Sequence, residues 1–318
     1  MAPESHRPRW KTLLAFGVIY FVWGSTFLAI RVGVREVPPL ILAATRFFTA
    51  GAVLCIWMRA RGERSPTARE WRSASFLGLV IFLFDYGLLF WAEQRVPSGI
   101  ASVMLATIPA FMALSEIIFL RTQRPTVRLV VALLIGIGGI VVLLAHSLKL
   151  GSAPIDRIGA MALIFASISW SVASVISRKL TLPDSKVMSA GTQMLAGGIF
   201  LALTAGALGE FRNFHPTTVS REAWLSLLYL IVAGSIIGYT AYVWLIHHES
   251  PTKVGTYAYV NPIVAVLVGY FLGGEALSAR TVVGTLFVLV SVVVITTTPA
   301  KKPEATLIAE TTPEGAGS

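Results

Sequence analysis

The chain has 318 residues, of which 55% are hydrophobic and 13% are charged, and its mean hydropathy is +0.74. A soluble globular protein carries about 25% charged residues, so this chain has too little polar surface for a water-soluble particle, and we expect an all-α integral membrane protein. The formal net charge of +10 does not indicate nucleic-acid binding, because the basic residues lie between apolar segments rather than on one domain.

Apolar runs of membrane-spanning length follow one another along the chain. We expect ten transmembrane helices, at residues 12–32, 38–58, 74–93, 98–120, 127–146, 157–178, 187–208, 224–246, 252–273 and 281–298. The first run is too long for a signal peptide and lacks a clear small-residue cleavage site, so we interpret it as a span. Segment 1–11 precedes it, and the tail 299–318 is rich in Thr, Pro, Glu and Gly, a composition that predicts disorder.

The distribution of basic residues predicts the orientation of the spans. If the N-terminus is cytoplasmic, the cytoplasmic segments hold 17 Lys and Arg residues and the opposite side holds 8, while Arg46 lies inside a span. Lys and Arg accumulate on the cytoplasmic side of membrane proteins. We therefore expect both termini in the cytoplasm, and an even number of spans agrees with that.

Two segments of the chain resemble each other. Trp91 to Pro109 reads WAEQRVPSGIASVMLATIP, and Trp244 to Pro262 reads WLIHHESPTKVGTYAYVNP. Further matches, at offsets of 153 or 147 residues, are Tyr86 with Tyr239, Trp23 with Trp170, Arg31 with Arg178, Thr45 with Thr192, Gly51 with Gly198 and Leu54 with Leu201. Their shared order predicts an internal duplication.

The duplication divides the spans into two repeats of five helices, at residues 12–146 and 157–298. Because five is odd, the second repeat enters the membrane from the opposite side, which is the inverted-repeat plan of many secondary transporters. Pro109 and Pro262 then lie roughly 16 Å and roughly 15 Å from one end of their spans, near the middle of a bilayer core about 30 Å thick. We expect interrupted helices beside a central cavity, with gentle kinks of no functional role as the alternative.

Three motifs resemble those of the drug/metabolite transporter superfamily, EamA type: WGSTFLAIRVG at 23–33, TRFFTAGAVL at 45–54 and VNPIVAVLVGYFLGGEALS at 260–278. The resemblance covers about residues 12 to 298. It implies a ten-helix secondary transporter of small molecules, commonly an exporter of amino acids or related metabolites in a bacterial inner membrane. A nutrient importer of the same fold is the alternative. The first repeat departs from the pattern, because Thr122 stands where the second repeat has Glu275.

Two ionisable residues lie near mid-depth, Arg46 in the second span and Asp85 in the third. Charged side chains inside a membrane are costly and are therefore functional candidates. Three interpretations stay open: a buried ion pair that fixes helix packing, a pair that meets the carboxylate and ammonium of a zwitterionic substrate, and Asp85 as a proton-coupling carboxylate. An adjacent arginine would keep Asp85 ionised, which disfavours the third.

Aromatic and amide side chains form a second set of candidates. Tyr and Trp combine apolar surface with one polar group, which suits amphipathic or cationic metabolites. Aromatic rings also fill helix bundles or anchor at membrane interfaces, which is the alternative for each ring. The candidate substrate-binding residues are Trp23, Arg46, Asp85, Tyr86, Pro109, Trp170, Tyr239, Tyr242, Tyr257, Asn261 and Pro262.

The motifs of an enzyme or an ATP-driven pump are missing from the sequence. It holds no phosphate-binding glycine loop and no HExxH, and its one cysteine, Cys55, excludes an internal disulfide. We therefore expect no catalytic residue, no metal and no cofactor. The expected mechanism is alternating access of the two repeats around a central site in the lipid bilayer. Substrate identity, proton coupling, the direction of net transport and homodimer formation stay open.

Overall fold

The computed structural model describes residues 9–95, 101, 104–121, 126–148, 156–273 and 279–297. Every regular element within these ranges is a helix. A helix satisfies its own backbone N–H and C=O groups, so long apolar segments adopt this form where water is excluded. The expected disordered tail 299–318 lies outside the described residues, as do Thr122, Glu275 and most of segment 1–11.

The helices of the first repeat follow the expected spans. They are α1 (Arg9–Gly33), α2 (Pro39–Ala60), the continuous run of α3 (Ala68–Leu77), η1 (Gly78–Gly87) and α4 (Leu88–Glu93), then α6 (Ile108–Ser115) with η2 (Glu116–Leu120), and α7 (Val127–Leu148). The fourth span departs from a continuous helix, because a turn at Ala106 and Thr107 precedes α6.

The second repeat has the same order of elements. They are α8 (Arg157–Ser177), α9 (Lys186–Ala207), the run of α10 (Arg221–Tyr229), η5 (Leu230–Tyr239) and α11 (Thr240–His248), then α12 (Pro251–Val254) with α13 (Tyr257–Gly273), and α14 (Ala279–Thr297). Two short turns, η3 (Glu210–Asn213) and η4 (Pro216–Thr218), lie between α9 and α10. Each expected span thus contains helix within its described residues.

Capping side chains fix where the helices of the second repeat begin. Asp156 Oδ1 accepts a hydrogen bond from the backbone N–H of Gly159 at 2.8 Å, just before α8. The hydroxyls of Ser185, Ser220 and Ser250 accept in the same way before α9, α10 and α12. Each cap satisfies a backbone N–H that the first turn leaves free, which contributes about 1 kcal/mol.

Both repeats contain a π-helical stretch at corresponding places. η1 carries Tyr86 and η5 carries Tyr239, and each stretch is ten residues long inside a longer helix. π-Helical hydrogen bonds join residues i and i+5, and such stretches occur frequently at functional sites. The two halves therefore share a local irregularity that a simple hydrophobic pattern does not predict.

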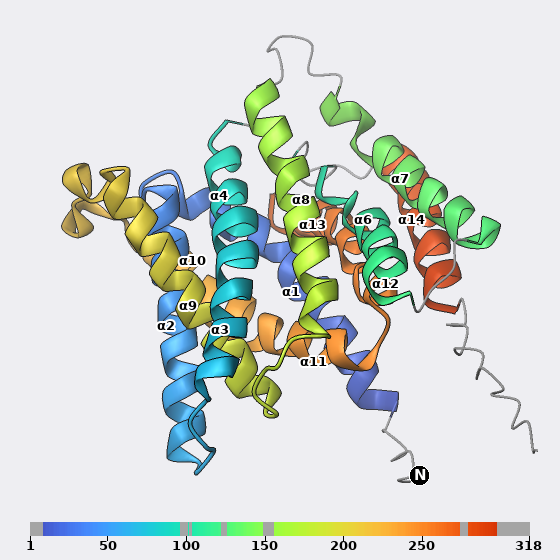
Figure 1. Cartoon of the computed structure of the whole chain (residues 1–318). Coiled ribbons are helices and arrows are strands. Elements are labelled where there is room, and N and C mark those ends of the chain that lie inside the picture. The colour runs from blue at the N-terminus through green and yellow to red at the C-terminus, as the bar shows by residue number, and fades with distance from the viewer. Residues whose placement is uncertain are drawn as a thin grey trace, which may run out of the picture.

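The helices of the two repeats make reciprocal contacts. α1 packs against α13, η5 and α11 of the second repeat, while its counterpart α8 packs against α6, η1 and α4 of the first. α2 packs against its own counterpart α9, and α7 packs against α14. Figure 1 shows α7 and α14 side by side at one edge of the bundle, away from α2 and α9. α1 and α8 therefore lie where both repeats meet.

The crossing of α2 and α9 depends on two corresponding glycines. A Cβ at Gly51 would lie less than 3.0 Å from the backbone of Leu195, and a Cβ at Gly198 would lie less than 3.0 Å from the backbone of Phe48. Small residues let membrane helices approach closely, which strengthens their packing. Glycine at both positions therefore brings the two helices into backbone contact.

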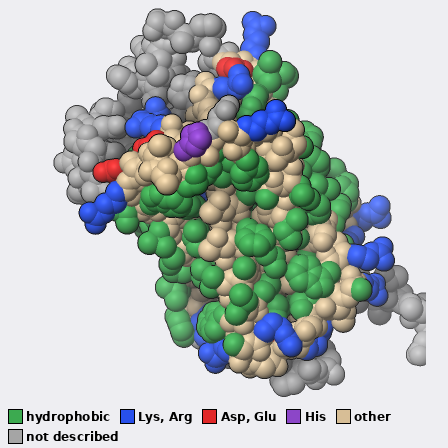
Figure 2. Space-filling view, turned by 90° about the vertical axis from the view of Figure 1, so that its left-hand side faces the viewer, with side chains coloured by type: hydrophobic (Ala, Val, Ile, Leu, Met, Phe, Trp, Pro, Cys, Tyr) green, Lys and Arg blue, Asp and Glu red, His purple; other side chains and the backbone are tan. Residues whose placement is uncertain are grey.

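Large apolar side chains cover the outside of the bundle. Phe21, Ile56, Phe165 and Leu203 are each more than half exposed. Figure 2 shows hydrophobic side chains over the middle of one face, with Lys and Arg mainly toward its ends. Among the described residues, six helical stretches are long and apolar enough to cross a membrane. This surface suits contact with lipid.

Candidate functional site

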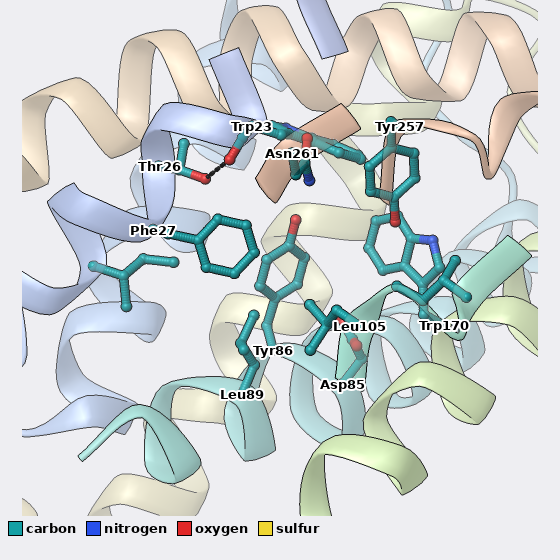
Figure 3. A pocket seen from close by; sticks show the side chains of 12 residues that line it. Trp23, Thr26, Phe27, Asp85, Tyr86, Leu89, Leu105, Trp170, Tyr257 and Asn261 are labelled. Atoms are coloured by element: carbon teal, nitrogen blue, oxygen red, sulfur yellow. Dashed lines mark hydrogen bonds between the residues drawn. The ribbon is translucent and has the colours of Figure 1, made fainter. Parts of the chain in front are cut away.

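A small pocket lies in the centre of the bundle, between elements of both repeats. Its volume is about 40 Å³, which is room for about three water molecules. Figure 3 shows its lining residues, which are Trp23, Thr26, Phe27, Ile30, Asp85, Tyr86, Leu89, Leu105, Ile108, Trp170, Tyr257 and Asn261.

One face of α1 supplies a wall of the pocket. Trp23, Thr26, Phe27 and Ile30 all line it, and residues at spacings of three, four and seven share one side of a helix. The Thr26 hydroxyl donates to the Trp23 carbonyl at 2.7 Å, as the dashed line in Figure 3 marks. The donor of Thr26 is thus used inside α1, and this wall is mostly apolar.

Aromatic rings from both repeats meet at the pocket. Trp23 and Trp170 pack edge to face with ring centroids 5.5 Å apart. Tyr257 packs on Trp23 at 4.8 Å, and Tyr86 packs on Trp170 at 5.6 Å. Each such pair stabilises packing by about 0.5–1.5 kcal/mol beyond its buried area. The rings therefore hold one another in place as a continuous aromatic wall.

The two corresponding tryptophans differ in their hydrogen bonds. Trp23 Nε1 donates to the Gly234 carbonyl at 3.0 Å. It lies beside Gly238, where a Cβ would be only 2.6 Å from that nitrogen. In the first repeat Asp85 takes the place of Gly238, and Trp170 Nε1 is buried without a hydrogen-bond partner in the described chain. The repeats thus present two similar rings in different polar surroundings.

Each candidate proline directly follows a pocket residue. Ile108 and Asn261 correspond in the two repeats and line the pocket, while the side chains of Pro109 and Pro262 do not. Pro109 lies in the first turn of α6, where its missing N–H costs nothing. Pro262 lies inside α13, which continues past it. The expected interruption is therefore present before Pro109, whereas at Pro262 the helix remains continuous.

Arg46 and Asp85 do not form an ion pair, which was one of the three interpretations of these residues. Arg46 Nε donates to Ser235 Oγ at 2.8 Å, and its guanidinium carbon lies 5.4 Å from the centroid of the Tyr86 ring. The side chain extends toward η5 because Gly234 leaves room there: a Cβ at Gly234 would lie 2.7 Å from Nη2. Arg46 is 1% exposed and does not line the pocket, and its Nη1 has no hydrogen-bond partner among the described residues.

Tyr239 and Tyr242 lie behind the pocket wall rather than in it. The Tyr239 hydroxyl donates to Gln193 Oε1 at 2.8 Å, and the Tyr242 ring lies 4.8 Å from Trp170. Gln193 corresponds to Arg46 and Tyr239 to Tyr86. The same two positions are therefore in contact in both repeats. In the first repeat Arg46 lies over the Tyr86 ring, and in the second Tyr239 donates a hydrogen bond to Gln193.

Hydrogen bonds join the helices on one side of the pocket. The Tyr242 hydroxyl donates to Ser174 Oγ, and the hydroxyls of Tyr20 and Thr256 lie 2.6 Å apart. These contacts lie toward the side where α1 begins and α11 ends, since Arg9 and His248 line one surface hollow there. In the other direction the pocket continues between apolar side chains such as Phe27 and Ile30 of α1.

Comparison with known proteins identifies the family. The sequence model of the EamA-like transporter family matches residues 10–145 and matches again at residues 157–297. The chain belongs to the EamA-like transporter family. The double match confirms the expected duplication, and the family is one of transporters.

Relatives of this EamA-like chain carry transporter names. It is 37% identical over 284 residues to the uncharacterized inner membrane transporter YedA of Escherichia coli (strain K12), covering 89% of each chain. It is 25% identical to an uncharacterized transporter of Archaeoglobus fulgidus, covering 90% of this chain and 97% of the relative. A crystal structure with a TM-score of 0.72 and 23% identity covers 91% of this chain and 98% of that one, which shows a shared fold.

Six of the candidate residues line the pocket of this EamA-like chain: Trp23, Asp85, Tyr86, Trp170, Tyr257 and Asn261. The lining residues that sequence reasoning missed are Thr26, Phe27, Ile30, Leu89, Leu105 and Ile108. Two signals could have found most of them. The α1 residues share a helical face with Trp23, and Ile108 and Leu89 correspond to the candidates Asn261 and Tyr242 in the other repeat. In the described ranges, no group of three His, Cys, Asp or Glu residues could hold a metal ion.

Proposed function

We propose that this chain is a secondary transporter that exports small amphipathic metabolites, amino acids and related compounds among them, across a bacterial inner membrane. The observation that carries the proposal is a central pocket built from corresponding positions of both repeats. Trp23 contacts Trp170 there, and the counterparts Ile108 and Asn261 both line the pocket. Transporters built from inverted repeats hold their substrates between the repeats.

The exchange of packing partners supports an inverted arrangement of ten spans. α1 contacts the third and fourth helical stretches of the other repeat through η5, α11 and α13, and α8 contacts the first repeat's equivalents. A two-fold relation between the halves produces such reciprocal contacts. Rocking of one half against the other about the α2–α9 contact would then expose the pocket to each side of the membrane in turn.

The pocket suits a closed state of this cycle. About 40 Å³ is far below the roughly 300–1,000 Å³ of sites that bury a small molecule. With both termini in the cytoplasm, the Tyr242–Ser174 and Tyr20–Thr256 contacts lie on the cytoplasmic side of the pocket. Substrate binding then requires these walls to separate, so the contacts act as an inner gate.

The test is exchange across sealed liposomes that contain the purified protein. Vesicles loaded with a labelled mixture of amino acids and small amines are placed in buffer with or without the unlabelled compounds. Alternating access predicts that unlabelled compound outside accelerates efflux of its labelled form. The Trp170→Ala variant should lose most of that exchange. A pH gradient across the same vesicles tests proton coupling. Efflux equal to that of protein-free vesicles for every compound would overturn the proposed substrates.

Orientation is tested with single cysteines in a Cys55→Ser background. Cysteine is placed at Glu36, between α1 and α2, and at Gly62, after α2, because both residues are exposed. In intact cells a membrane-impermeant maleimide should label the Glu36→Cys variant, and it should label the Gly62→Cys variant only after lysis. The reverse pattern would contradict cytoplasmic termini.

A further inference from the structure

Asp85 is the one acidic side chain that lines the central pocket within the described ranges, and it has no partner there. It is 3% exposed. The ion pairs in the described chain join Arg64 and Arg95 to other carboxylates, and no hydrogen bond joins the Asp85 side chain to any described residue. A buried carboxylate without a partner is costly, so the site gains stability from a ligand that supplies a positive charge or hydrogen-bond donors.

A second free acceptor lies in the same pocket. Asn261 Oδ1 is buried and accepts no hydrogen bond from the described residues. Figure 3 shows Asn261 in the upper part of the view and Asp85 in the lower part, with the ring of Tyr86 beside the space that separates them. The Asn261 oxygen can only accept, and so can both oxygens of Asp85 when it is ionised. Their natural ligand is a group with several N–H donors, and an ammonium ion supplies three.

The rings around these acceptors suit a cation. Trp23, Tyr86, Trp170 and Tyr257 all line the pocket, and the faces of Trp and Tyr attract ammonium groups strongly where water is excluded. The remaining wall is apolar, with Phe27, Leu89 and Leu105 among its members. The pocket therefore offers one end for a charged amine and one for an apolar body.

The pocket offers no cationic counterpart for a carboxylate among its described residues. Their side chains include no Lys, Arg or His, and the free donor among them is the neutral Nε1–H of Trp170. The nearest candidate, Arg46, contacts the rings of Phe47 and Tyr86 and the hydroxyl of Ser235 instead of lining the cavity. A zwitterionic amino acid would place its carboxylate among neutral side chains, without a cation to compensate the buried charge, which is unfavourable.

We propose that the pocket recognises organic ammonium ions, primary amines attached to an aromatic or apolar body, with Asp85 as the counterion of the ammonium, Asn261 as a further acceptor and the body among the tryptophan rings. The inference rests on the proposed transport function and narrows its substrates from amphipathic metabolites in general, amino acids included, to amines. The amine enters when the walls of the closed pocket separate. Asp85 binds the ammonium group, and Asn261 and the aromatic rings select for the shape of the amine around that group.

The experiment measures binding of three labelled compounds that share one ring: phenethylamine, phenylalanine and phenylpropionate. The full-length protein is used in lipid nanodiscs, with equilibrium dialysis as the readout. Phenethylamine should bind at least roughly tenfold more tightly than phenylalanine, a difference of about 1.4 kcal/mol, and phenylpropionate should not bind measurably. Asp85→Asn should weaken phenethylamine binding by roughly tenfold or more, and Asn261→Leu by a smaller factor.

Glu93→Gln is the matched control, because Glu93 is a carboxylate on the same helical run whose buried oxygens also lack partners in the described chain, yet it does not line the pocket. This variant should bind phenethylamine like the unaltered protein. Thermal unfolding verifies that all variants are folded. The inference is overturned if phenylalanine binds more tightly than phenethylamine, if Asp85→Asn and Glu93→Gln have equal effects, or if no amine binds. Liposome exchange of phenylalanine without phenethylamine would overturn it while leaving the transport function intact.

Discussion

Trp23 and Trp170 occupy the same place in the two repeats, and their rings meet edge to face with centroids 5.5 Å apart. If an axis relates the two repeats, only residues close to that axis can touch their own counterparts. The contact therefore marks the centre of the molecule, and it lies in the wall of the pocket. Any movement of one repeat against the other must change the geometry of this pair.

The two tryptophans should respond differently to the same substitution. Trp23→Phe leaves the Gly234 carbonyl without the hydrogen bond that it accepts at 3.0 Å, whereas Trp170→Phe removes a nitrogen that has no partner in the described chain. We expect Trp23→Phe to lower the free energy of unfolding by about 1 kcal/mol more. Unfolding of both variants in detergent measures the difference. Equal losses would show that the hydrogen bond contributes nothing.

The crossing of α2 and α9 should tolerate no side chain at its glycines. Gly51→Ala and Gly198→Ala each place a Cβ less than 3.0 Å from the facing backbone, and overpacking of this kind costs about 1–3 kcal/mol. Gly17→Ala is the control, because no atom outside its own helix lies within 4 Å of a Cβ there. That variant should gain roughly 0.5–1 kcal/mol from helix propensity. A Gly51→Ala variant as stable as Gly17→Ala would contradict the close crossing.

The bond between Tyr242 and Ser174 should couple α11 to α8. Tyr242→Phe and Ser174→Ala each remove one partner, so the double variant should lose less stability than the sum of the single losses. A coupling of about 0.5–1.5 kcal/mol is expected for a buried hydrogen bond. A double-mutant cycle of unfolding free energies measures it. Strict additivity would mean that the two hydroxyls do not interact.

Low pH should loosen the connection between α1 and α10. Glu36 accepts hydrogen bonds from the backbone N–H and hydroxyl of Ser220 at 2.6 and 2.7 Å, and these bonds hold its pKa below the usual range. A lowered pKa in the folded state means that the bonds stabilise the fold above the ordinary glutamate value, about 4.3, and that this contribution is lost as the pH falls through the folded value.

Hydrogen exchange at the start of α10 measures this effect. Protection of its first turn should fall in the unaltered protein below about pH 4. In Glu36→Gln it should be weaker at neutral pH and should respond less to acid. Identical pH profiles for the two proteins would show that Glu36 does not hold this helix.

The sequence predicted the fold well because hydropathy and repetition are properties of whole segments. The run from 187 to 208 became α9 (Lys186–Ala207), and the offset of 147 residues identified Trp23 and Trp170 as counterparts. The candidates chosen from the sequence include half of the residues that line the pocket. Hydropathy and helical period can both be read from residue types.

The direction of individual side chains could not be predicted in this way. Arg46 and Asp85 were expected at one depth on neighbouring spans, but depth alone does not fix rotation. Gly234 leaves the space into which the Arg46 guanidinium extends, and that glycine lies nearly 190 residues further along the chain. The π-helical stretches were not predicted either, because a change of hydrogen-bond partner from i+4 to i+5 leaves no mark on composition.

The paired stretches η1 and η5 have a consequence for insertions and deletions. A deletion within Gly78–Gly87 that converted the stretch to ordinary α-helix would change the rotation of the residues along it, because an α-helix turns by about 100° per residue and a π-helix by less. Local hydrogen bonding would improve, yet Tyr86 would leave the pocket wall. The length of each stretch is therefore set by the direction in which its side chains must face. A more regular helix at this place would disrupt the pocket.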